Sequence, residues 1–555
     1  LGGRPAEGAE KDRDGDASGQ EATAPAPETR VDEEGLHQRV VPVPVSGARY
    51  THLQAVQGGL VWLKQPLRGE LGEDLPRAGD EPERATLEHI DLATGKLQKL
   101  ADRAEVVVAT ADGKQLVVSD GDALRVLPGT HKQEKPESGE DDSVVDLSRV
   151  RVEVNPPAEW TQMFHEAWRL MRDHYWRADM DGVNWEGARD RYAPLLGRIG
   201  SHDDLIDLIW EMQGELGSSH AYCAPPPPKV DPSRRQGLLG ADVELDGDSW
   251  RLVRIVPGEP SLRQARSPLT APGVGARVGD AIVAVDGRPT GPTVSPAQLL
   301  VGKAEKPVEL TLAPQGGGSA RRVVVVPLAD EFPLRYQDWV NGRRRYVHER
   351  TDGRVGYLHV PDMVSTGWAQ LHRDLRTEVG RDALIVDVRG NNGGHTSQLV
   401  VEKLARRIIG WDLSRGYQPA SYPSDARRGP MVTVTDMYAG SDGDIVTAAI
   451  QSLGLGPVVG SRTWGGVIGI DGRYQLVDGT SVTQPRYSFW FERFGWGIEN
   501  YGVDPDVEVV PAPQDRVARV DVELDRALTL VERELKRTPP LQPPPLPDPR
   551  HWSST

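Results

Sequence analysis

Residues 435–456 read TDMYAGSDGDIVTAAIQSLGLG, and Ser441 in this stretch lies where one pattern ends and another begins. Upstream, residues 431–436 (MVTVTD) alternate in the manner of a strand. Downstream, apolar side chains recur at helical spacing, at Ile445, Ala448, Ala449 and Leu453. The sequence therefore predicts a strand-to-helix turn at Ser441.

A serine at the start of a helix admits two interpretations. Its hydroxyl can cap the helix by accepting a free backbone N–H of the first turn. The same N–H groups can instead stabilise an oxyanion beside a nucleophilic hydroxyl. Capping is the commoner role for an arbitrary serine, so the choice depends on the rest of the chain.

Strands and helices alternate through residues 329–530, which predicts βαβ units and a largely parallel sheet. A second strand-to-helix turn, DVRGNNGGH (387–395), follows a buried-looking strand. Its adjacent glycines allow backbone N–H groups to approach a ligand closely. Both turns are expected at the carboxyl ends of parallel strands, where α/β sheets form their active sites.

The composition limits the possible classes of protein. A chain of 555 residues is expected to form several domains, and its net charge of −17 argues against binding to nucleic acid or to an anionic membrane. No apolar run approaches the roughly 18 residues of a membrane span. A single cysteine, Cys223, rules out an internal disulfide and favours a reducing, cytoplasmic location. The chain begins with Leu1, as a fragment of a longer product would.

Six segments are expected from the changes in composition and pattern. They are a disordered linker (1–38), partial β-propeller blades (39–148), a helical catalytic subdomain (149–235), a PDZ domain (236–328), an α/β catalytic domain of the crotonase or ClpP type (329–530) and a Pro-rich tail (531–555). In the second segment, the turns ADGK and DGDA mark hairpins between short strands. One or two blades cannot close a propeller, so a generic β-meander is the alternative.

The segment 236–328 resembles a PDZ domain in its GLLG loop (237–240) and in GDAIVAVDG (279–287). That resemblance implies a loop whose N–H groups bind a peptide carboxylate, and a sheet edge that pairs with the peptide. The alternative is a module that only positions its neighbours.

Together, DVRGNNGGH and YAGSDGD (438–444) resemble the tail-specific, or carboxyl-terminal-processing, serine proteases of family S41. Most members of that group use a Ser–Lys dyad. In the corresponding motif of this sequence, GSRTWGGV (460–467), Gly466 stands where the lysine would be. Another base must therefore activate Ser441, because a free hydroxyl is a weak nucleophile.

His220 is the expected base, since an imidazole suits general-base catalysis near neutral pH. Here the chain is similar to the tricorn branch of the group, over residues 39 to about 530. That resemblance implies a tetrad completed by Ser219 and by Glu499, in GWGIENYGVDPD. His395, beside the glycine pair, is a rival base.

Further roles follow from the same resemblance. The backbone N–H groups of Asp442 and Gly394 would bind the oxyanion, with Gly393 as the close alternative to Gly394. Asp412 would favour basic side chains at the P1 position, although a turn residue is an equally good interpretation. No metal or cofactor is expected. Two residues near these motifs receive ordinary interpretations: Cys223 is expected to be structural, and Asp444 to offset the helix dipole.

The resemblance implies a serine endopeptidase that degrades oligopeptides, such as proteasome products, through an acyl-enzyme intermediate. It also implies a homohexamer that admits its peptide substrates through propellers. Two other functions stay open: a PDZ-containing scaffold with an inactive protease domain, and a crotonase-like enzyme built on the same βαβ units.

Overall fold

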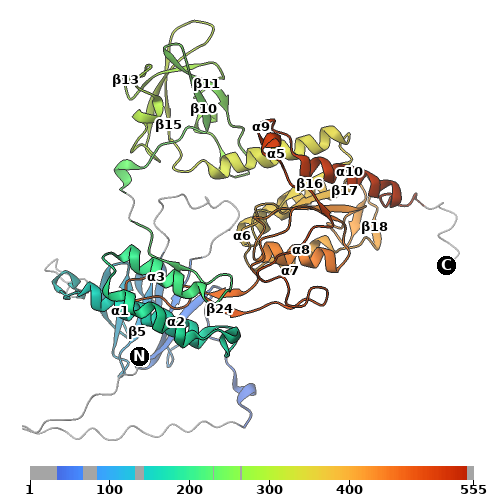
Figure 1. Cartoon of the computed structure of the whole chain (residues 1–555). Coiled ribbons are helices and arrows are strands. Elements are labelled where there is room, and N and C mark those ends of the chain that lie inside the picture. The colour runs from blue at the N-terminus through green and yellow to red at the C-terminus, as the bar shows by residue number, and fades with distance from the viewer. Residues whose placement is uncertain are drawn as a thin grey trace, which may run out of the picture. The chain divides into compact units, whose positions relative to one another are not determined.

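The chain forms two compact units, Leu1–Arg151 and Val152–Thr555, which are described separately (Figure 1). The structure, a computed structural model, describes residues 34–546 apart from 67–83, 132–142, 229–230, 260 and 263–264. Most of the linker expected over 1–38, and the part of the expected tail after 546, lie outside the described residues.

The first unit consists of two four-stranded antiparallel sheets, each a meander in chain order. The strands are β1 (Tyr50–Val56), β2 (Gly59–Lys64), β3 (Ala85–Asp91), β4 (Leu97–Ala104), β5 (Val106–Ala109), β6 (Gln115–Asp120), β7 (Ala123–Pro128) and β8 (Val144–Val145). Both sheets contribute to one apolar core, with Leu63 and Leu87 from the first and Val107 and Leu116 from the second. The expected hairpins at ADGK and DGDA are confirmed, while the propeller stays a prediction.

The second unit begins with α1 (Pro156–His174), α2 (Trp185–Tyr192) and α3 (His202–Gly214). A capping box begins α3, because Ser201 and Asp204 each accept the other's backbone N–H. After α3, β9 (Cys223–Ala224) pairs with β23 (Ser481–Val482), a segment far along the chain. This pairing brings the end of the helical region to the catalytic domain.

The segment that resembles a PDZ domain is a β-rich module with its own apolar core. Its sheet runs in the order β10-β11-β12-β14-β15, with β13 beside β12. The elements are β10 (Ala241–Asp246), β11 (Ser249–Ile255), β12 (Ala281–Val285), β13 (Arg288–Pro289), α4 (Pro296–Leu299), β14 (Val308–Ala313) and β15 (Arg321–Val325).

Three N–H groups of the GLLG loop, those of Gly237, Leu238 and Gly240, already have acceptors within the chain, unlike the free donors that the PDZ resemblance implied. The N–H of Leu238 donates to the carbonyl of Leu328 at 2.9 Å, and that of Gly240 donates to Glu331 Oε1 at 2.6 Å. Arg335 ties the same carboxylate down, donating to Glu331 Oε2 at 2.7 Å. A carboxylate of the chain itself therefore occupies the Gly240 donor of the loop, which favours the alternative interpretation of a module that positions its neighbours.

The α/β domain is an open sheet in which every neighbouring pair of strands is parallel, in the order β16-β17-β20-β21-β25. The strands are β16 (Val355–His359), β17 (Ala383–Asp387), β20 (Met431–Thr435), β21 (Val458–Gly460) and β25 (Val507–Glu508). Short hairpins extend from it, formed by β18 (Gly410–Asp412) with β19 (Ala420–Tyr422) and by β22 (Gly469–Asp471) with β24 (Gln484–Tyr487). The expected multidomain architecture with a PDZ module and an α/β domain is confirmed.

Helices cover both faces of this sheet (Figure 1). On one face lie α5 (Phe332–Arg350) and α10 (Val522–Arg537), and on the other α6 (Ser365–Glu378), α7 (Ser397–Leu404) and α8 (Asp442–Ser452); α9 (Pro513–Val517) precedes α10. The tail boundary expected at 531 is wrong, because Val531 is buried within α10 against the sheet. None of the helices in the described ranges is long and apolar enough to cross a membrane.

The closed GLLG loop leads to a test of peptide binding. Replacing Glu331 by Ala frees the Gly240 N–H, so a peptide with a free C-terminal carboxylate is expected to bind at least about tenfold more tightly. Fluorescence anisotropy with a labelled peptide measures the affinity, and the C-terminally amidated peptide is the control. Glu331→Gln retains an acceptor and should stay close to wild type; equal affinities of wild type and Glu331→Ala would contradict the prediction.

Candidate active site

Ser441 occupies the strand-to-helix turn between β20 and α8, as its sequence pattern predicts. Its backbone has φ 57° and ψ −119°, a conformation that is strained for a residue with a Cβ. Although Ser441 is the N-cap residue of α8, its hydroxyl makes no capping hydrogen bond. The capping interpretation therefore fails, and the turn is of the sharp kind that exposes a nucleophile.

The second turn packs directly against the first. The N–H of Gly440 donates to the carbonyl of Asn391 at 3.0 Å. A Cβ at Gly393, where φ is +75°, would lie 2.5 Å from the Cβ of Ser441 and 3.1 Å from its Oγ. Only glycine allows this approach, so the glycine pair places the second turn against the serine side chain.

Two backbone donors remain free beside Ser441. The N–H of Gly393 is used, because it donates to Asn391 Oδ1 at 2.9 Å. In the described part of the chain, the N–H groups of Gly394 and Asp442 donate to no acceptor. Of the two glycines, Gly394 is thus the one with a donor available for an oxyanion.

Ser219, His220 and Glu499 lie together, although Glu499 comes from a region 280 residues after Ser219. Ser219 Oγ is 2.9 Å from His220 Nδ1 and donates to Glu499 Oε2 at 3.1 Å. The same carboxylate accepts backbone N–H groups from Ser219 at 2.7 Å, Val467 at 2.7 Å and Ile468 at 3.1 Å. Since the Ser219 hydroxyl donates to Glu499, it accepts from Nδ1–H, and His220 Nε2 is left with a lone pair.

The environment of His220 favours the neutral imidazole that a general base requires. Burial lowers the pKa of the imidazole, while the charge of Glu499 and the backbone of Ile468 act in the opposite direction. The ring is therefore neutral near pH 7 and can accept a proton.

Trp464 lies against both halves of the site. Its ring contacts the His220 ring edge to face, with centroids 5.4 Å apart. A Cβ at Gly440, next to the serine, would lie 2.7 Å from Trp464 Cε3. Among the described residues, no hydrogen bond joins His220 to Ser441.

The position expected for a lysine is closed by Trp464 and by Asp444. A Cβ at Gly466 would lie 2.3 Å from Trp464 Cζ3. The N–H groups of Gly465 and Gly466 donate to the two oxygens of Asp444, at 2.8 and 3.2 Å. Asp444 is fully buried, and burial raises its pKa.

Sequence reasoning missed the role of Asp444. Its place in the first turn of α8 fits an exposed carboxylate that offsets the helix dipole, yet the side chain points inward and holds the 465–466 turn. No spacing rule in the sequence links it to that turn, which lies about twenty residues later.

The other candidates make no side-chain hydrogen bond to Ser441, Ser219, His220 or Glu499 among the described residues. Asp412 is exposed in β18, where it accepts a hydrogen bond from the Ser414 hydroxyl at 3.3 Å. His395 is exposed, and its side chain donates to or accepts from no described residue. Cys223 is buried in β9, and burial raises the pKa of its thiol to about 12, which suits a structural role.

Comparisons with protein families match three parts of the chain. The model of the tricorn protease C1 domain matches residues 156–214, that of the tricorn protease PDZ domain matches 237–330, and that of peptidase family S41 matches 354–509.

Individual relatives match nearly the whole chain. It is 56% identical over 522 residues to tricorn protease homolog 1 of Streptomyces coelicolor, covering 94% of this chain and 49% of the relative. It is 34% identical over 501 residues to the tricorn protease of Thermoplasma acidophilum, covering 90% and 46%. A crystal structure of the tricorn protease superposes with a TM-score of 0.81 at 34% identity, covering 90% of this chain and 48% of that one. The chain thus spans about half the length of these relatives.

Proposed function

Because the chain belongs to the tricorn branch of peptidase family S41, we propose that it is a serine peptidase with Ser441 as nucleophile and His220 as general base. The observation that carries the proposal is the strained turn at Ser441, whose hydroxyl is not used to cap α8. The hydrogen-bonded series from Glu499 through Ser219 to His220 supports the choice of base.

In the proposed reaction, Ser441 Oγ attacks the scissile carbonyl while His220 Nε2 takes the hydroxyl proton. The imidazolium then protonates the leaving amine, and water hydrolyses the acyl-enzyme with the same histidine as base. Ser219 and Glu499 hold the ring and stabilise its charged form. The free N–H groups of Gly394 and Asp442 bind the oxyanion, and each such donor contributes about 10²–10³ to kcat in other serine peptidases.

The hydrogen bond between His220 and Ser441 is proposed to form in the substrate complex. Catalytic hydrogen bonds often tighten only when substrate is bound. Trp464 contacts the His220 ring and packs against Gly440, so movement of its half-exposed indole is proposed to accompany this step.

The proposed substrates are oligopeptides, including products of other proteases, cleaved within a homohexamer whose propellers admit them. This part of the proposal rests on the resemblance to tricorn proteases, and the two blade-sized sheets of the first unit are compatible with it. A cytoplasmic location belongs to the same proposal.

The nucleophile and base are tested by substitution. Ser441→Ala and His220→Ala should each abolish peptide hydrolysis, and Ser441→Ala should also abolish labelling by a fluorophosphonate, because the attacking oxygen is gone. Ser452→Ala, on the same helix, and His395→Ala, the rival base, are the matched controls and should keep activity. Loss of activity in His395→Ala with activity retained in His220→Ala would transfer the role of base to His395.

The same experiment separates the alternative functions. A folded wild-type protein that neither hydrolyses peptides nor takes up the fluorophosphonate, beside a control protease that does, would favour an inactive PDZ scaffold. Turnover of acyl-CoA thioesters without peptide hydrolysis would favour a crotonase-like enzyme.

The pH dependence follows from the state of His220. Activity requires the neutral ring, so kcat/KM should rise with pH through the pKa of His220, with its midpoint below the ordinary 6.5 because burial lowers that pKa. The charge of Glu499 raises the pKa, so Glu499→Gln should move the midpoint to lower pH while the plateau falls. A pH–rate profile measures both, and a shift to higher pH in the variant would argue against the charge effect.

Asp412 is proposed to attract basic P1 side chains. In the described residues no cation pairs with its exposed carboxylate, so it is available to a substrate. Asp412→Ala should therefore reduce kcat/KM for cleavage after Arg or Lys more than after Leu. An unchanged ratio between matched Arg and Leu substrates would remove Asp412 from the specificity site.

A further inference from the structure

The loop that carries Gly394 starts at the peptide between Arg389 and Gly390, and this peptide is held on both sides. The Arg389 carbonyl lies 3.0 Å from His359 Nε2, at the end of β16. The Gly390 N–H donates to Asp436 Oδ1 at 2.9 Å, and Asp436 also accepts the N–H of Tyr438 at 3.1 Å. The start of the loop is thus fixed between β16 and the segment that leads to Ser441.

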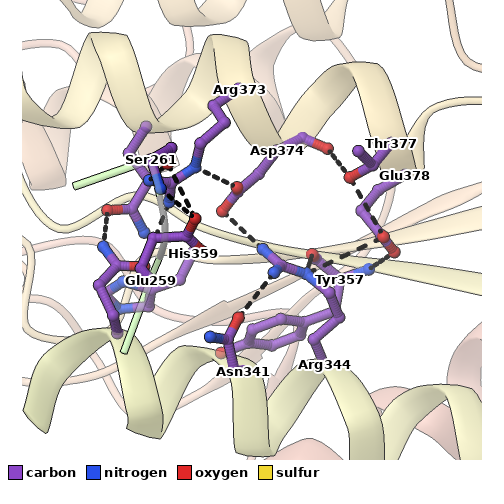
Figure 2. Close-up of polar contacts among 12 residues, drawn as sticks. Glu259, Ser261, Asn341, Arg344, Tyr357, His359, Arg373, Asp374, Thr377 and Glu378 are labelled. Carbon is purple, nitrogen blue, oxygen red and sulfur yellow. Dashed lines mark hydrogen bonds and ion pairs between the residues drawn. The ribbon is translucent and has the colours of Figure 1, made fainter. Parts of the chain in front are cut away.

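Behind His359, a series of hydrogen bonds runs between α5 and α6. Arg373 Nη2 donates to Gln337 Oε1 at 3.2 Å, and Gln337 Nε2 donates to Gln370 Oε1 at 2.9 Å. Gln370 Nε2 donates to the Tyr336 hydroxyl at 2.8 Å, which lies 2.6 Å from His359 Nδ1. Figure 2 labels Arg373 and His359, and shows Arg373 also bound to Asp374.

The donor at one end of this series and the acceptor at the other fix the direction of every hydrogen bond between them. A guanidinium can only donate and a carbonyl can only accept. Arg373 therefore fixes the orientation of the Gln337 amide, which fixes that of Gln370, and Tyr336 is left to donate to His359 Nδ1. His359 then carries its proton on Nε2 and donates it to the Arg389 carbonyl.

Burial makes this arrangement rigid. Gln337, Gln370 and His359 are all buried, so a reversed amide or tautomer would leave polar groups unpaired without access to water. Burial also lowers the pKa of His359, which keeps the ring neutral.

We propose that His359 is a positioning residue for catalysis: its Nε2–H holds the Arg389 carbonyl so that the loop presents the Gly394 N–H to the oxyanion, and Arg373 sets its tautomer through Gln337, Gln370 and Tyr336. The inference rests on the proposed function for its catalytic consequence. Its structural part, the restraint of residues 389–394, is independent of any activity.

Steady-state kinetics with a peptide substrate tests the catalytic part. His359→Leu removes the donor and should lower kcat about ten- to a hundredfold with KM changed less than about twofold, because a misplaced oxyanion donor affects the transition state more than binding. His359→Gln can place an N–H near Nε2 and accept from Tyr336, so it should recover most of the lost kcat. Wild-type kcat in His359→Leu, or no recovery in His359→Gln when both variants melt at the same temperature, would overturn the proposal.

Arg373 tests the remote end of the series. Arg373→Met releases the Gln337 amide and should lower kcat about three- to tenfold, although Arg373 is separated from the loop by four side chains. Arg376→Met, an exposed arginine on the same helix, is the matched control and should keep wild-type kcat. Equal effects of the two substitutions would show that Arg373 does not set the tautomer.

Hydrogen exchange separates failure of this inference from failure of the proposed function. In the full chain, amides of residues 388–396 should exchange at least about tenfold faster in His359→Leu than in wild type, and near the wild-type rate in His359→Gln. If wild type proves inactive but exchange follows this order, the proposed function fails and the restraint by His359 stands. If exchange is unchanged in His359→Leu, the restraint fails whatever the activity.

Discussion

The contact between two strand-to-helix turns is the constraint on which the site depends. The Gly440 N–H donates to the Asn391 carbonyl, and Gly393 leaves room for the Ser441 side chain where any Cβ would collide. The turns can meet because β17 and β20 are neighbours in a parallel sheet and end at the same edge. Backbone geometry thus brings the proposed nucleophile on one turn close to a free N–H donor on the other.

The proposed base, His220, comes from a different part of the chain, the helical region before the PDZ domain. The pairing of β9 with β23 brings the segment after α3 to the catalytic domain, and Thr483 donates to the His220 carbonyl at 2.5 Å. Glu499 then accepts N–H groups from both regions, from Ser219 on one side and from Val467 and Ile468 on the other. One carboxylate thus joins the proposed base to the domain that carries Ser441. Loss of this carboxylate would leave several backbone N–H groups without an acceptor.

The sequence is enough to predict which turns form the site, but it does not predict most of the long-range hydrogen bonds that hold the site together. Periodicity is enough to place Ser441 at a strand-to-helix turn and to predict helical and α/β regions, because these features are local. The PDZ region and the grouping of Ser219, His220 and Glu499 are expected from family resemblance. Periodicity does not give the use of the Gly240 N–H by Glu331, the inward direction of Asp444 or the series behind His359. Each of these depends on which distant group fills a buried position, and the chain has no local pattern for that.

The residues packed around Gly466 explain why this position has no lysine. Any side chain there would meet the Trp464 ring, which itself requires glycine at 440 and packs against His220. Asp444 holds the N–H groups of Gly465 and Gly466, and its burial would be unfavourable without these two donors. A lysine could enter only by moving the indole that supports the imidazole, so in this chain the histidine and the tryptophan exclude the dyad found elsewhere in the family.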